Sequence, residues 1–142
     1  VVRRALALFD RLVIGVGVNV GKHCMLTPPQ RVEAIRRLYV HEPRVEVDSY
    51  DDLTVDFARR HGADFVVKGV RGVCDFESER EQADINRRLT GLETVLLLAE
   101  PGLDSVSSSV VRELHRFGRD VRPFLPEGMA AHDGGADAAD NE

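Results

Sequence analysis

Residues 68–79 read Lys68-Gly69-Val70-Arg71-Gly72-Val73-Cys74-Asp75-Phe76-Glu77-Ser78-Glu79 and follow directly on the apolar run Phe65-Val66-Val67. An apolar strand, a glycine-containing turn with two cations and a charged helix, in that order, are typical of an α/β protein. Ligands of such proteins bind beyond the carboxyl ends of the parallel strands, which is where this turn is placed. The stretch therefore predicts a parallel sheet with an anion-binding turn at its edge.

The same alternation of strand and helix recurs on both sides of this stretch. A helical segment over 1–9 comes first, and four strand–helix pairs follow it. The expected strands cover 12–18, 44–50, 65–67 and 94–99, and the expected helices cover 27–39, 51–61, 76–89 and 109–117. Nearly all-apolar strands at 12–18, 65–67 and 94–99 indicate burial on both faces, whereas 44–50 alternates like a half-exposed strand. This order predicts an α/β fold with a doubly wound parallel sheet.

Several helix boundaries carry their own signals. Thr27 and Gln30 have the spacing of a capping box, with Pro28 at the first helical position between them. Gly62 and Gly118 are placed to end the helices that precede them. These residues predict where the helices start and stop independently of the strand pattern.

Composition limits the kind of protein this can be. The 142 residues carry a net charge of −5, which argues against a general nucleic-acid binder, and no apolar run is long enough to span a bilayer. The N-terminus does not have the pattern of a signal peptide, and Cys24 and Cys74 form no CxxC motif, so we expect a cytoplasmic protein. One domain is expected over 1–127, followed by a disordered acidic tail over 128–142.

Two segments are candidates for binding phosphate. Lys68 and Arg71 flank a turn in which Gly69 would let the backbone approach a ligand, and Arg71 can bind phosphate through two parallel N–H groups. The segment Val106-Ser107-Ser108-Ser109-Val110-Val111-Arg112 opens a helix, where backbone N–H groups and hydroxyls favour anions. The alternatives are solvated basic residues in the first segment and simple serine N-capping in the second.

Other polar residues carry weaker signals. Lys22 lies in a loop after a strand and can reach an anion at the sheet edge, although an exposed lysine is usually only solvated. Asp75 and Glu79 share one face at the start of a helix, where acidic residues are favoured in any case. The sequence contains no P-loop motif, no GxSxG motif and no histidine pair with zinc-ligand spacing.

The chain resembles the bacterial phosphopantetheine adenylyltransferases from residue 1 to about Pro126. The resemblance rests on short motifs that occur in order and at the right spacing. They are Asn19-x-x-Lys22, Gln30-Arg31-Val32, Val45-Glu46-Val47, Lys68-Gly69-Val70-Arg71, Asp75-Phe76-Glu77-x-Glu79, Asn86-Arg87 and the Ser-rich segment 106–112. The resemblance implies a Rossmann-like fold and transfer of adenylyl from ATP to 4′-phosphopantetheine, with Mg²⁺ on the ATP phosphates. It also implies a homo-oligomer, a hexamer in this family.

The resemblance also implies roles for individual residues. Lys22, Arg71 and Ser109 match catalytic positions, and Lys22, Thr54 and Lys68 match positions that hold phosphopantetheine. The positions that match the ATP site are Gly69, Val70, Arg71, Glu79, Leu103, Asp104, Ser105, Val106, Ser107, Ser108 and Ser109. No residue of this chain is expected to bind a metal ion directly.

Three departures from the family pattern shape the expectations. Lys68 stands where well-known members have Arg, and Ser78 stands where an aromatic residue is common. The family's first strand, with its Gly-Thr-Phe-Asp-Pro…Gly-His segment, has no counterpart in residues 1–142. In the family this strand lies mid-sheet, so we expect strands 12–18 and 65–67 to lack the partner between them, and the activity of this chain to be impaired.

Two alternatives remain at this point. The chain can be another nucleotidyltransferase of the same superfamily, because the Ser-rich segment and Lys68-Gly69-x-Arg71 are widely shared within it. It can also be a non-catalytic remnant that binds nucleotide, because the family's catalytic His has no counterpart here. Asp75-Phe76-Glu77 together with Asn86-Arg87 favours the adenylyltransferase.

Overall fold

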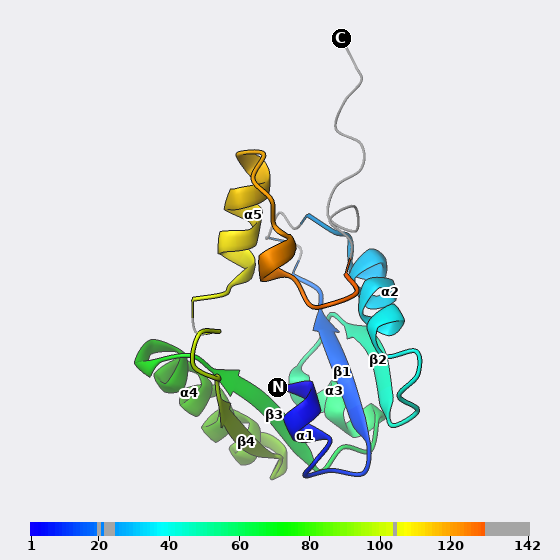
Figure 1. The fold of residues 1–142 in the computed structure, drawn as a ribbon. Coiled ribbons are helices and arrows are strands. Elements are labelled where there is room, and N and C mark those ends of the chain that lie inside the picture. Colours follow the sequence, from blue (N-terminus) through cyan, green and yellow to red (C-terminus); the bar gives the residue numbers. More distant parts are fainter. Residues whose placement is uncertain (20, 22–24, 104, 130–142) are drawn as a thin grey trace.

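The computed structural model describes residues 1–19, 21, 25–103 and 105–129, and it has the expected order of one helix followed by four strand–helix pairs (Figure 1). The elements are α1 (Val2–Ala5), β1 (Leu12–Gly17), α2 (Pro28–Leu38), β2 (Val45–Tyr50), α3 (Thr54–Arg60), β3 (Phe65–Val70), α4 (Val73–Thr90), β4 (Glu93–Leu98), α5 (Ser108–Arg116) and the 3-10 helix η1 (Arg122–Phe124). No helix in these ranges is long and apolar enough to cross a membrane.

The strands form two separate parallel pairs. β1 pairs with β2, from Leu12 opposite Val45 to the carboxyl ends of both strands, and β3 pairs with β4, from Phe65 opposite Glu93. Among the described residues no ladder joins β1 to β3. A cavity of about 550 Å³ lies between these two strands instead, as expected for two strands that lack a partner between them.

The strands are less buried than the sequence predicts. We expected 12–18, 65–67 and 94–99 to be buried on both faces, yet Phe65 is 48% exposed and Leu98 is 67% exposed. Each of the two sheets has only two strands, so every strand is an edge strand. An edge strand is less buried than a strand in the centre of a wide parallel sheet. The buried residues instead form small clusters, one around Val16, Val32 and Val47.

Helices α2 and α4 each pack on one pair of strands. α2 packs on β1 and β2, and its capping box is confirmed: Thr27 Oγ1 accepts from the Gln30 N–H, and Gln30 Oε1 accepts from the Thr27 N–H. α4 packs on β3 and β4 and ends at Gly91, which has the left-handed conformation that favours glycine. α3 packs against α4, so the two half-sheets, β1–β2 and β3–β4, are also linked through helices.

The N-terminal segment lies between the two half-sheets in the ribbon view, close to the cavity (Figure 1). The expected helix over 1–9 is shorter than predicted, because α1 ends at Ala5 and turns follow. The Arg4 guanidinium donates to the carbonyl of Leu98 at the end of β4, and Arg44 Nη1 donates to the Leu6 carbonyl at 3.1 Å. The segment thus contacts both half-sheets, and these tertiary contacts set its conformation.

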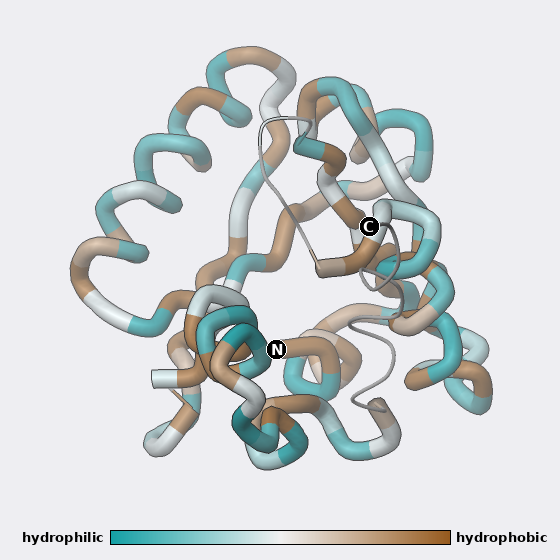
Figure 2. The backbone as a smooth tube through the Cα atoms, turned by 90° about the horizontal axis from the view of Figure 1, so that it is seen from above, coloured by the Kyte–Doolittle hydropathy of each residue, from teal (hydrophilic) through white to brown (hydrophobic). Residues whose placement is uncertain are grey.

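α5 stands apart from the sheets in the ribbon view (Figure 1), and none of its residues is buried. Along the chain, hydrophobic and hydrophilic residues alternate over short distances, as in amphipathic elements (Figure 2). The N-terminus of α5 is held locally, because Ser107 Oγ accepts from the Val110 N–H at 3.3 Å. Gly118 follows the helix with φ +67°, as predicted for a glycine that ends it.

Gly15 of β1 lines the cavity and is closely packed against two aromatic rings. A Cβ at this position would lie 2.7 Å from a ring carbon of Phe57 and 3.0 Å from one of Tyr50, whereas at Gly17 the nearest atom would be 3.6 Å away. Phe57 is buried and stacked on Tyr50, so its ring has little room to yield. We expect Gly15→Ala to lower the free energy of unfolding by about 1–3 kcal/mol in urea titrations. Gly17→Ala is the control and should stay close to wild type; equal losses would contradict this packing.

Candidate functional site

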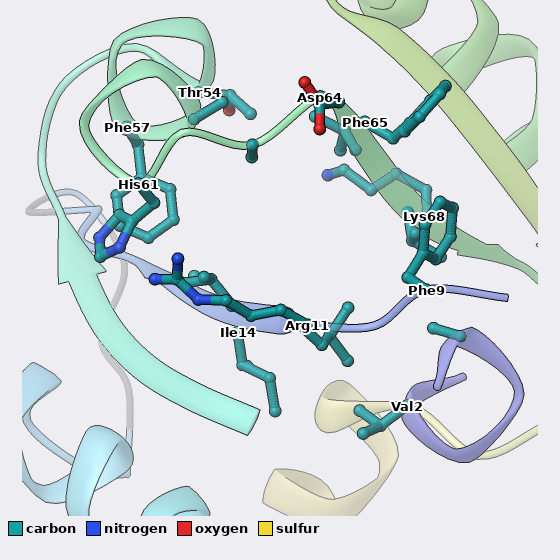
Figure 3. A pocket seen from close by; sticks show the side chains of 18 of the residues that line it. Val2, Phe9, Arg11, Ile14, Thr54, Phe57, His61, Asp64, Phe65 and Lys68 are labelled. Carbon is teal, nitrogen blue, oxygen red and sulfur yellow. The ribbon is translucent and has the colours of Figure 1, made fainter. Parts of the chain in front are cut away.

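Lys68 lies inside a strand rather than after one. β3 runs to Val70, three residues beyond the expected end, because it continues to pair with β4 up to Leu98. The Lys68 side chain lines the cavity and points into it from β3 (Figure 3), and its Nζ lies 3.6 Å from Glu79 Oε2 on α4. The structure therefore brings together two residues that were assigned to different substrates.

Thr54 lies on the wall of the same cavity, at the first residue of α3 (Figure 3). Its Oγ1 is 3.3 Å from the hydroxyl of Tyr50, at the carboxyl end of β2. Tyr50 in turn stacks on Phe57 with ring centroids 4.5 Å apart, which fixes the wall. Thr54 on α3 and Lys68 on β3, both predicted to hold phosphopantetheine, thus line one cavity.

His61, which follows α3, is bound to two carboxylates of β2. His61 packs on Phe57, and its ring nitrogens lie 3.0 Å from Asp48 Oδ2 and 3.4 Å from Glu46 Oε1. The Ser49 backbone N–H, and after it His61, lower the pKa of Asp48. These contacts hold α3 on β2 and keep Thr54 in place.

Arg71 joins the two candidate phosphate-binding segments. It follows β3 directly, and its Nη1 donates to the carbonyl of Val106 in the Ser-rich segment at 3.2 Å. Its Nε donates to Asp75 Oδ2 at 3.0 Å, and its backbone N–H donates to the same oxygen at 3.2 Å. Hydrogen bonds from Arg71 lower the pKa of Asp75, first through the guanidinium and then through the backbone. Arg71 and the Ser-rich segment, the two candidate phosphate-binding segments, are therefore in direct contact.

The serines of this segment have different environments. Ser107 caps α5, which matches the simpler alternative for this residue. Ser109 Oγ accepts from Arg112 Nη2 at 3.1 Å, and Ser108 is exposed. Leu103 and Ser105 are exposed in the turns before the helix. Three serines in a row therefore leave one hydroxyl, that of Ser108, without a protein partner among the described residues.

Gly69 and Val70 do not present side chains to a ligand. The Val70 side chain is buried, so only its backbone is available. We expected Gly69 to allow close approach of a ligand, but the space over its Cα is filled by Val1, whose Cγ2 would lie 2.7 Å from an added Cβ. In this structure the lack of a side chain at Gly69 therefore serves the packing of the N-terminal segment.

Some predicted residues cannot be placed. Lys22 and Asp104 lie outside the described residues, as does 130–142 of the predicted tail.

Within the described ranges, no group of three or more His, Cys, Asp or Glu residues could hold a metal ion. Asp75 was expected only as an acidic residue at a helix start, and its bonds to Arg71 were not predicted, although the spacing of four residues could have indicated them.

Comparison with known proteins gives a consistent result. A family model described as cytidylyltransferase-like matches residues 1–114. A phosphopantetheine adenylyltransferase of Phocaeicola vulgatus is 56% identical over 129 residues, which cover 91% of this chain and 85% of the relative. The proteins of the same name from Bacteroides fragilis and Rubrobacter xylanophilus are 51% and 44% identical, again over 91% of this chain and over 86% and 79% of theirs.

Proposed function

The chain belongs to the phosphopantetheine adenylyltransferases, the nucleotidyltransferases of coenzyme A biosynthesis, and we propose that its substrates are ATP and 4′-phosphopantetheine. In the proposed reaction a phosphate oxygen of phosphopantetheine attacks the α-phosphorus of ATP. The bond from that phosphorus to the oxygen bridging to the β-phosphate breaks, and pyrophosphate leaves with its electron pair. The products are dephospho-coenzyme A and pyrophosphate, and no covalent enzyme intermediate forms.

The observation that carries the proposal is the hydrogen bond from Arg71 to Val106. It connects the turn after β3 with the start of α5, so a guanidinium and a helix N-terminus face one region. Both groups stabilise phosphate charge, and fixed donors of this kind accelerate phosphate transfer by positioning and electrostatics. We assign ATP to Arg71, Glu79 and the Ser-rich segment, with Gly69 and Val70 contributing backbone only.

Phosphopantetheine is assigned to the part of the cavity near Thr54 and Lys68, and not to the space between β1 and β3 that a further strand would fill. Its phosphate would bind Lys68, and its arm would pass along the apolar wall that carries Thr54. The acceptor phosphate would then lie at Lys68 of β3, three residues before Arg71 in the turn that is proposed to hold ATP. Lys22 is assigned to the same phosphate by resemblance alone.

Metal, assembly and location are further parts of the proposal. By resemblance to the family, we assign Mg²⁺ to the phosphate oxygens of ATP, the ligands this ion usually takes from a nucleotide. The net charge of −5 supports small-molecule partners over nucleic acid. A homo-hexamer and a cytoplasmic location follow from the family, and sedimentation equilibrium tests the hexamer.

An adenylyl-transfer assay tests the function. The protein is incubated with ATP, Mg²⁺ and 4′-phosphopantetheine, and dephospho-coenzyme A and pyrophosphate are quantified together. CTP in place of ATP tests the wider superfamily alternative, and ATP titration without an acceptor tests for a nucleotide-binding protein without catalysis. ATP binding without any product would favour that last alternative over the transferase.

Lys68 provides a substrate-specific prediction. We expect Lys68→Gln to weaken binding of 4′-phosphopantetheine about tenfold, because a charge-assisted bond to phosphate is lost. ATP binding should change much less, and Lys68→Arg should keep the affinity for phosphopantetheine. Calorimetric titration with each substrate measures both constants. An equal loss for the two substrates would contradict the assignment of Lys68 to the acceptor.

A further inference from the structure

Asp75 makes contacts that differ from those of other acidic residues on α4. Its Oδ2 accepts from both the Nε and the backbone N–H of Arg71, so one oxygen fixes both ends of that residue. Asp84, further along the helix, pairs with Arg87 and Arg88 at 3.3 and 2.9 Å, and both partners lie on α4 itself. Glu79 on the same helix pairs with a single cation, Lys68 of β3. The Asp75 pair differs from both, because its partner Arg71 lies before the helix and continues to the carbonyl of Val106 in the Ser-rich segment.

The position of Asp75 determines which donors of Arg71 remain for a ligand. A guanidinium has five N–H groups. Asp75 occupies the Nε–H and Val106 occupies one Nη1–H, which leaves the other Nη1–H and both Nη2–H groups without a partner among the described residues. A carboxylate on Nε holds the plane of the group while the far side stays open for a bidentate anion.

We propose that Asp75 is a positioning residue that aims the Arg71 guanidinium at the ATP phosphates and, through it, holds the Ser-rich segment at Val106. This inference rests on the proposed function of Arg71. Asp75 itself does not touch the nucleotide. It acts by restricting a long side chain that would otherwise sample many rotamers, and an ordered donor binds phosphate more tightly than a mobile one.

Simple electrostatics predicts the opposite sign, which makes the proposal testable. A carboxylate next to a phosphate site repels phosphate, so its neutralisation alone would tighten ATP binding. An ordinary exposed ion pair at this spacing contributes little, so its loss alone would change almost nothing. Only a positioning role predicts that Asp75→Asn weakens ATP binding.

The experiment compares Asp75→Asn and Asp75→Glu with the matched control Asp84→Asn in the 142-residue chain. Calorimetry with ATP and with 4′-phosphopantetheine gives the affinities, and amide hydrogen exchange of Val106–Val110 without ligand reports on the Ser-rich segment. We expect Asp75→Asn to weaken ATP binding about tenfold, to leave phosphopantetheine unchanged and to speed exchange of these amides. Asp75→Glu should restore part of the ATP affinity, and Asp84→Asn should behave like wild type.

The two readouts separate the possible failures. Unchanged exchange at Val106–Val110 in Asp75→Asn would overturn the inference, as would tighter or unchanged ATP binding. If the wild-type chain does not bind ATP, the proposed function fails, and the exchange measurement on the ligand-free protein still decides whether Asp75 holds the segment.

Discussion

An Arg71→Ala protein is expected to bind ATP about 10- to 100-fold more weakly than wild type. The truncation removes a cation that would form charge-assisted hydrogen bonds to the phosphates, worth about 1.5–3 kcal/mol. It also removes the hydrogen bond from the Arg71 guanidinium to the Val106 carbonyl, so the Ser-rich segment loses this tether. Calorimetric titration with ATP, and the KM for ATP where turnover is measurable, report both effects.

The matched control for this prediction is Arg119→Ala. Arg119 is exposed in the turn after α5, and its backbone N–H donates to the Leu114 carbonyl. Its truncation removes the same charge from the protein as a whole without touching the turn after β3. Equal ATP affinities for the two variants would remove Arg71 from the nucleotide site.

A strand supplied to the cavity between β1 and β3 is expected to raise the melting temperature by several degrees. The facing edges of these six-residue strands make no ladder with each other, although each is paired on its other side. A parallel strand between them would pair with both and cover apolar residues such as Ile14 and Val66. For domains of this size each kcal/mol gained shifts the melting temperature by about 2–8 °C.

The comparison uses two N-terminal extensions of equal length, fused before Val1. One carries an apolar six-residue strand, and the other carries proline at alternate positions, which removes backbone donors. Thermal unfolding followed by circular dichroism gives the melting temperatures, and amide exchange shows whether β1 and β3 become protected. If the proline-containing extension stabilised the protein as much, strand pairing would not be the cause.

The local features of the fold could be predicted from the sequence. The capping box at Thr27 and Gln30, and the helix ends at Gly62 and Gly118, depend on residues within a few positions of one another. The alternation of strand and helix is set by apolar periodicity, which is also local. The parallel α/β class followed from that alternation, and the structure confirms it.

Features that depend on distant contacts could not be predicted in the same way. β3 extends through Lys68 and Gly69 because β4 pairs with it there, and no local pattern shows that register. The role of Gly69 depends on Val1, which lies far away in the sequence. Apolar strand composition indicated full burial, but burial also depends on how many strands flank each one.

The ion pairs of the candidate site have a consequence for how it takes up its substrates. Lys68 and Arg71 each contact one carboxylate, Glu79 and Asp75 respectively, so the two cations already have internal counter-ions. If Lys68 holds the acceptor phosphate as proposed, the incoming anion has to compete with Glu79 for the ammonium group. Dissolved salt weakens the pair between Lys68 and Glu79 as well as the contact with the phosphate. The affinity for the phosphate should therefore fall less steeply with ionic strength than it would for two cations without counter-ions. A doubly charged phosphate outcompetes a single carboxylate more readily than chloride does, so we expect the proposed site to discriminate between anions by their charge.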